Sequence, residues 1–203
     1  MILNNEKKWL YIGPPKTGST AISYVLTDGK YNKNEFIQDS NLNFKGIEIN
    51  GQHTPWPPDK LSSEYDDYNV FISVRNPFSR IVSLYNHWKY GQNYENELFL
   101  KEKTLEEFME LVLNKKLSND GFFHYTITDW VSRYSSFIKQ ENLQNDLRML
   151  NIHSIDFNVP IINEKLGSTK HWKEEHNKKT IEMTIEWAKK DFYNFEYSKD
   201  INV

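Results

Sequence analysis

The stretch YIGPPKTGST, residues 11–20, joins an apolar segment to a segment with helical spacing through a loop of glycine and proline. Gly13 and Gly18 are spaced as in the phosphate-binding loop G-x-x-x-x-G-K-[ST], yet Ser19 stands where that loop has its lysine. The lysine of this stretch is Lys16, which precedes the second glycine by two residues. The loop is therefore a damaged ATP loop, a chance turn, or a loop for a different phosphate ester.

The segments around this loop alternate between strands and helices. WLYIG (9–13) is a short apolar run that predicts a buried strand. STAISYVL (19–26) has helical spacing, and we expect Ser19, alone or with Thr20, to cap this helix. Further strands are expected at 44–49, 69–74 and 135–140, and further helices at 78–88, 104–114, 142–150 and 180–192. This order predicts an α/β fold, a P-loop-like three-layer architecture in which helices flank a central, mainly parallel sheet.

Length and composition narrow the class of protein. The chain has 203 residues, which suits one domain over residues 1–203. The absence of cysteine excludes disulfides and thiolate chemistry, and the net charge of −3 argues against general nucleic-acid binding. The sequence shows no apolar run near the roughly 20 residues of a membrane span, and its N-terminus does not resemble a signal peptide. We therefore expect a soluble, cytoplasmic protein without nucleic-acid or membrane partners.

The chemistry of residues 13–20 suits an anion. A loop that enters a helix offers backbone N–H groups and the positive end of the helix dipole. Gly18 allows close backbone approach, Ser19 and Thr20 add hydroxyl donors, and Lys16 adds a positive charge. Taken alone, the loop is also compatible with an ordinary strand-to-helix turn that carries an exposed lysine.

A second candidate anion site follows the strand expected at 69–74. Arg75 stands at the end of that strand, and Ser83 lies eight residues later in the next expected helix. A guanidinium group is a planar fork for phosphate oxygens, and a serine hydroxyl adds one donor. Taken alone, this pair is equally compatible with an arginine at a strand end and a buried helical serine. Together with the loop, it makes two phosphate cradles where a parallel sheet meets a helix.

The two motifs resemble those of a known family. PKTGST (15–20) looks like the 5′-phosphosulfate loop of sulfotransferases that use 3′-phosphoadenosine 5′-phosphosulfate (PAPS), and RNPFSRIVSLYNHW (75–88) looks like their 3′-phosphate motif. The later segments 134–150 and 171–197 also resemble the family. The resemblance is closest to the group of Golgi-type carbohydrate sulfotransferases. It implies a transferase that moves a sulfuryl group from PAPS to an acceptor hydroxyl, on a carbohydrate, and releases adenosine 3′,5′-bisphosphate (PAP).

The resemblance also implies roles for particular residues. It assigns nucleotide binding to Lys16, Thr17, Gly18, Ser19, Thr20, Arg75, Ser83 and Lys170. Lys16 is implied as catalytic too, because its ammonium can neutralise charge on the bridging oxygen as the sulfuryl group leaves. Taken alone, Lys170 is better explained as a solvent-facing lysine. The family needs no metal, which fits a strand that ends at Arg75 and not at an aspartate.

The acceptor hydroxyl must lose a proton to a base that titrates near neutral pH. His53, in NGQHTPWPP (50–58), follows the strand expected at 44–49 and occupies a place comparable to the base of some relatives. Glu48 is the alternative base, and His53 is equally compatible with a loop histidine bonded to the backbone. The partner is a small-molecule or saccharide acceptor, and the sequence leaves the oligomeric state open.

Two other functions remain open at this stage. One is a P-loop kinase of a small molecule, which the displaced lysine and the lack of a metal-binding aspartate disfavour. The other is a relative that binds a nucleotide without catalysis. Ligand preference separates the kinase from the two others, and turnover separates the enzyme from the non-catalytic relative.

Overall fold

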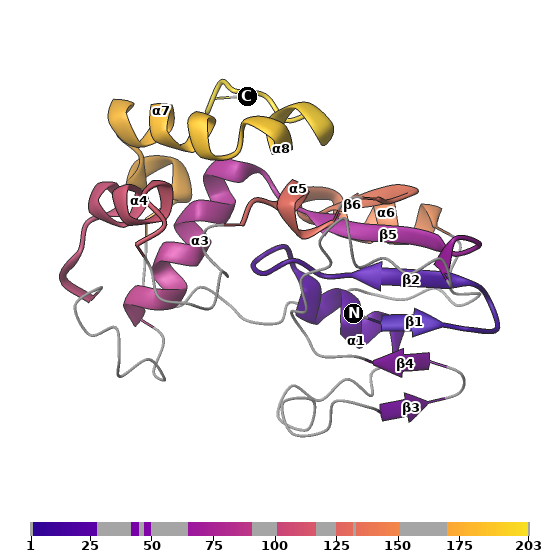
Figure 1. Ribbon diagram of the computed structural model, residues 1–203. Helices are drawn as coiled ribbons and strands as arrows, with labels where there is room; N and C mark the ends of the chain where they lie inside the picture. The colour runs from indigo at the N-terminus through magenta and orange to yellow at the C-terminus, as the bar shows by residue number, and fades with distance from the viewer. Residues whose placement is uncertain are drawn as a thin grey trace. The chain divides into compact units, whose positions relative to one another are not determined.

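The computed structural model describes residues 2–27, 42–44, 47–49, 65–90, 101–116, 125–131, 133–150 and 170–202 (Figure 1). The chain forms two compact units, each of which is described by itself below. The first comprises Met1–Val74 and Asp129–Ile162, and the second comprises Arg75–Thr128 and Asn163–Val203. The single domain expected over residues 1–203 stays a prediction.

The first unit is built on a six-stranded sheet with the order β3-β4-β1-β2-β5-β6 (Figure 1). Its strands are β1 (Ile2–Asn4), β2 (Trp9–Ile12), β3 (Leu42–Phe44), β4 (Ile47–Ile49), β5 (Asn69–Val74) and β6 (Ser136–Lys139). Strand β5 runs parallel to both β2 and β6, whereas β1, β3 and β4 pair antiparallel with their neighbours. The expected α/β class is confirmed, and the parallel part of the sheet is β2-β5-β6.

Two expectations about strands were wrong. The segment 44–49 was expected to form one strand, but Phe44 belongs to β3 and Ile47–Ile49 to β4, and these two strands pair antiparallel with Phe44 opposite Ile47. Strand β1 was not expected, because three residues, ILN, are too short to show a clear alternation.

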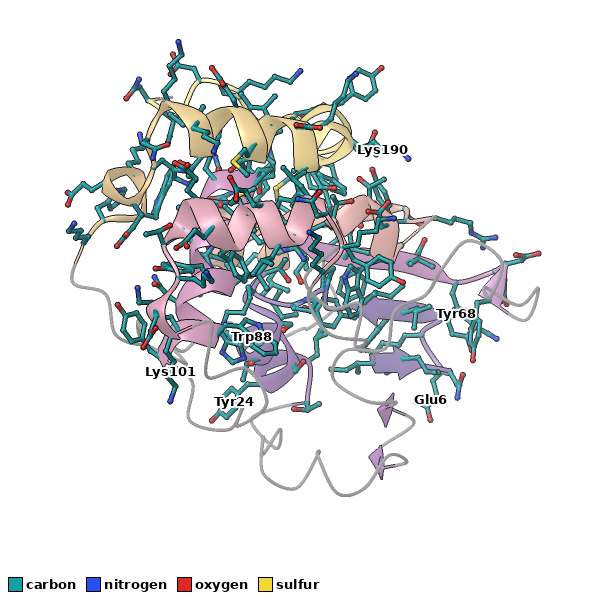
Figure 2. All side chains as sticks on the ribbon, turned by 60° about the vertical axis from the view of Figure 1, so that its left-hand side comes forward. Glu6, Tyr24, Tyr68, Trp88, Lys101 and Lys190 are labelled. Carbon is teal, nitrogen blue, oxygen red and sulfur yellow. The ribbon has the colours of Figure 1, made fainter. Side chains whose placement is uncertain are left out.

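One face of the sheet is covered by helices of the same unit. Helix α1 (Ser19–Leu26) contributes Ile22 and Leu26, and α6 (Leu143–Met149) contributes Leu147. These side chains pack with alternate residues of the strands: Ile2, Trp9, Tyr11, Phe71 and Ile138. Period-2 alternation in β2 and β5 thus places one set of side chains under α1 and α6. Tyr24 is the exposed residue of α1 and points outward (Figure 2).

The second unit is helical in the part that the structure describes. Helices α3 (Pro77–Tyr90), α4 (Leu105–Leu113) and α7 (Lys178–Trp187) share one core, in which Trp88, Phe108 and Met183 are buried (Figures 1 and 2). Pro77 begins α3, as expected from its fixed φ. Thr104 and Glu107 form the capping box expected at the start of α4.

The end of the chain departs from the single helix expected at 180–192. Helix α7 ends at Trp187, and α8 (Lys189–Asn194) begins two residues later, with Ala188 at φ −103° and ψ 26° between them. This break lets both Ala188 and Phe192 pack against Phe78 in a second small core. Before α7, the chain forms a short 3₁₀ helix (Trp172–Glu175) whose tryptophan packs on both cores.

Candidate functional site

A chain of buried hydroxyl groups holds the loop of the first unit. The Thr17 hydroxyl donates to the carbonyl of Pro14 at 2.6 Å and lies 2.6 Å from Ser73 Oγ, which lies 2.9 Å from Tyr11 Oη. Each hydroxyl has one proton, and the carbonyl of Pro14 can only accept. Ser73 therefore donates to Thr17, and Tyr11 donates to Ser73. This one-directional chain ties the loop to β2 and β5.

Thr17 is fully buried, so its hydroxyl group belongs to this hydrogen-bonded chain and does not reach the surface. If Thr17 contributes to nucleotide binding as expected, it therefore does so through its backbone N–H. Sequence reasoning missed Tyr11 and Ser73. The signal that could have found them is a serine within the apolar strand NVFISV, on the same face of the sheet as Tyr11.

Both glycines of the loop are required by geometry. A Cβ on Gly13 would lie 2.7 Å from Ser19 Cβ and 2.9 Å from Tyr11 Oη, so only glycine fits there without a shift. Gly18 has a φ of 81°, and a Cβ at this position would lie 3.2 Å from Gln140 Cγ. Gln140 follows β6, so the segment after β6 packs directly against the loop that follows β2.

The N-terminus of α1 is left without a side-chain cap. Its N-cap residue is Gly18, which has no side chain, so the cap expected from Ser19 or Thr20 is wrong. The first turn of α1 also contains no acidic residue. The backbone N–H groups of a first helical turn and the positive end of the helix dipole suit an anion. Lys16, half-buried at φ 65°, lies in the loop that leads into this helix end.

The arginine motif of the second unit is organised by the start of α3. Asn76 caps the helix, because its Oδ1 accepts the N–H of Phe78 at 3.0 Å. The Nε–H of Arg75 donates to Ser79 Oγ at 2.9 Å, and the Ser79 hydroxyl donates to the carbonyl of Asn76 at 3.1 Å. Ser83 lies one helical turn beyond Ser79 on the same face of α3. The contact of Arg75 with Ser79 therefore lies on the helix face that carries Ser83.

A second arginine of this motif is structural. Arg80 is fully buried, and both of its terminal nitrogens donate to the carbonyl of Tyr125 at 3.3 Å. The buried carboxylate of Asp191 accepts hydrogen bonds from the N–H groups of Ile127 and Thr128 and from the Thr128 hydroxyl. Burial raises the pKa of Asp191, while the charge of Arg80 and these hydrogen bonds oppose the rise. The two charges anchor α3 and α8 to the start of α5 (Ile127–Trp130).

His176 is half-buried against the same helix α3. Its Nε2 lies 3.1 Å from the carbonyl of Phe78, which requires a proton on Nε2, and its Nδ1 lies 3.3 Å from Thr180 Oγ1. Burial lowers the pKa of His176, and the hydrogen bond to Phe78 partly opposes this. The neutral imidazole therefore connects α3 with the start of α7 through these two contacts.

The acceptor-side predictions fall largely outside the described residues. His53 lies outside them, so its role as base stays a prediction. Glu48 lies on β4, where its backbone pairs with Leu3 and Asn43. Lys170 is exposed at the start of the segment that leads into Trp172. Lys170, Arg75 and Ser83 all belong to the second unit.

The described part of the chain contains no group of three or more His, Cys, Asp or Glu side chains that could hold a metal ion. Within the same residues, no helix has the length and apolar character needed to cross a bilayer.

Comparison with known proteins matches the chain to one family. The family model described as "Sulfotransferase family" matches residues 1–198, nearly the whole chain. No curated protein and no solved structure matches the chain. The match covers the loop at 13–18, the arginine motif at 75–83 and the helices that close the second unit.

Proposed function

The chain belongs to the sulfotransferase family, and from that premise we propose that it transfers a sulfuryl group from PAPS to a hydroxyl group of a carbohydrate acceptor. The observation that carries this proposal is the uncapped N-terminus of α1 behind the glycine loop. A helix end without a side-chain cap or an acidic first turn supports the binding of a phosphate or phosphosulfate. A second observation disfavours a kinase, because β5 leads into Arg75 and not into a metal-binding aspartate.

The residues of the chain suit the two ends of the nucleotide. The backbone N–H groups of the loop and the hydroxyl groups of Ser19 and Thr20 would bind the 5′-phosphosulfate. Arg75 and Ser83 would bind the 3′-phosphate, which is supported by the contact that Arg75 makes on the Ser83 face of α3. Lys170 would add a positive charge to the nucleotide site.

Two side chains would act in the transfer itself. PAPS supplies the sulfuryl group, which bonds to the acceptor oxygen as the bond from sulfur to the bridging phosphate oxygen breaks. Lys16 would place its ammonium near that bridging oxygen and stabilise the negative charge that the electron pair leaves there. His53 would take the proton from the acceptor hydroxyl, with Glu48 as the alternative base.

Ligand binding tests the donor. We expect PAP to raise the melting temperature of the protein without magnesium, and Mg-ATP to have little effect. Stabilisation by Mg-ATP alone would contradict the proposal and support a kinase. Turnover of PAPS with a panel of saccharides, phenols and tyrosine peptides, read by the mass of the product, then separates an enzyme from a non-catalytic relative and identifies the acceptor.

The base is tested by substitution. We expect His53→Ala to reduce turnover by about 10²–10⁴-fold and to leave PAP affinity nearly unchanged, because the base contacts the acceptor. Glu48→Gln is the matched control and should retain turnover. If Glu48→Gln abolishes turnover and His53→Ala is mild, the carboxylate is the base.

A further inference from the structure

Ser79 is the buried hydroxyl group on which Arg75 rests. Ser79 is 4% exposed and lies in the first turn of α3. Its one proton is donated to the carbonyl of Asn76 at 3.1 Å, so its oxygen can only accept from Arg75 Nε, at 2.9 Å. The oxygen is itself held by a helix start that Asn76 caps. Arg75 Nε therefore donates to an acceptor that is itself held in place by the start of α3.

This contact decides how the guanidinium group can bind an anion. A guanidinium binds an oxyanion in two parallel hydrogen bonds, either through Nε and one Nη or through both Nη groups. The bond to Ser79 uses the Nε–H and fixes the plane of the group. While this contact is kept, an anion that binds Arg75 in a bidentate way would therefore use the two Nη groups.

We propose that Ser79 is a positioning residue that sets the guanidinium plane of Arg75 and directs its two Nη groups to the 3′-phosphate of PAPS. This inference rests on the proposed function, since it concerns how the same site recognises its nucleotide. Ser79 does not contact the nucleotide itself. It acts through Arg75, and its removal lets the arginine sample orientations that do not match the phosphate.

The test compares PAP with adenosine 5′-phosphosulfate, which lacks the 3′-phosphate, by calorimetric titration. Ser79→Ala should weaken PAP binding about tenfold, the usual value of one hydrogen bond to a charged group. Binding of adenosine 5′-phosphosulfate should be nearly unchanged. Ser79→Thr, which keeps the hydroxyl, should restore PAP affinity. In the Arg75→Lys background, Ser79→Ala should have no further effect on PAP, because lysine has no Nε–H to hold.

A matched control separates positioning from stability. Thr184 is also a fully buried hydroxyl of the second unit, and it donates to the carbonyl of Thr180 at 2.7 Å. Thr184→Val should lower the melting temperature and leave the affinity for PAP unchanged. Equal weakening of both nucleotides by Ser79→Ala, or the same loss in the Arg75→Lys background, would overturn the inference alone. A wild-type protein that does not bind PAP would overturn the proposed function as well.

Discussion

At the scale of single residues, Lys16 occupies a backbone conformation that costs free energy. Its φ of 65° lies in the left-handed region, which a residue with a Cβ enters at a cost of about 1 kcal/mol. Glycine would adopt it freely. The loop is thus strained at the position of its one lysine, a half-buried residue. Strain of this kind is common at functional sites.

Lys16→Gly should therefore separate stability from catalysis. Because glycine relieves the strain, the free energy of unfolding should stay equal or rise, while turnover should fall by about 10²-fold or more. The matched control is Lys8→Gly, since Lys8 is a lysine at φ 53° in the turn between β1 and β2. It should leave turnover unchanged. Turnover and chemical denaturation are measured on both variants, and full activity of Lys16→Gly would exclude Lys16 from the reaction.

The hydroxyl chain beneath the loop gives a graded prediction. Ser73→Ala removes the central hydroxyl and leaves Tyr11 without its acceptor, so it should lower the free energy of unfolding by about 1–3 kcal/mol and weaken PAP binding. Tyr11→Phe removes only the first donor and should cost less in both measurements. Tyr68 directly precedes β5, at the opposite end of that strand from Ser73 (Figure 2). Tyr68→Phe, which removes a hydroxyl that donates to Asn5 at 2.5 Å, should leave PAP affinity unchanged.

At the scale of helices and strands, the sequence predicted most of what lies around the loop. The bounds of β5 and α1 agree with the expected segments 69–74 and 19–26, because apolar runs and helical spacing persist over enough residues to be read. The misses are short or depend on partners distant in the chain. Strand β1 exists through its pairing with β2 and β4. The break at Ala188 depends on packing with Phe78, which no local pattern announces.

Helix capping divides the helices into two kinds. Helices α4 and α7 begin with complete capping boxes, at Thr104 and Asn177, whereas α1 begins at Gly18 with no side-chain cap. In α4 and α7 the cap side chain accepts a backbone N–H of the first turn, whereas the cap residue of α1 has no side chain to do so. A cap therefore contributes to stability in α4 and α7, and under the proposed function the start of α1 contributes to nucleotide binding instead.

Thr104→Ala should lower the free energy of unfolding by about 1 kcal/mol, because Thr104 Oγ1 accepts the N–H of Glu107 at 3.2 Å. PAP affinity should not change. Thr104→Ser, which also caps, should behave as the wild type. Gly18→Ala, in contrast to Thr104→Ala, should weaken PAP binding. An L-residue at φ 81° next to Gln140 must move the start of the helix. Thermal unfolding and calorimetric titration distinguish these outcomes.

At the scale of the whole molecule, the sequence predicted the two motifs of the candidate site, but not the hydrogen bonds that support them. The loop and the arginine motif could be read because glycine, lysine and arginine at these spacings carry phosphate chemistry. The groups that hold them could not. Ser79 acts on Arg75 through a contact four residues apart, and Ser73 acts on Thr17 across two strands. Such supporting contacts follow from the fold and have no sequence motif of their own.

The stability of the second unit should depend on pH through His176. Burial lowers the pKa of this imidazole below its usual 6.5, so the unfolded chain binds a proton at a pH where the folded protein does not. The stability that the neutral imidazole contributes is therefore fully present above about pH 6.5. It is lost as the pH falls from there through the folded pKa. Denaturation in urea at a series of pH values measures this loss.

His176→Gln isolates the effect, since an amide placed at Nε2 can still donate to the carbonyl of Phe78 but does not titrate. The slope of unfolding free energy against pH should flatten in the variant just below about pH 6.5. The remaining slope at lower pH belongs to carboxylates such as Glu107, whose pKa is lowered to about 2 by hydrogen bonds from the backbone N–H of Thr104, from Lys103 and from the Thr104 hydroxyl. That contribution is present above about pH 4.5 and is lost below it. A variant with an unchanged slope near pH 6 would show that the titrating group lies elsewhere.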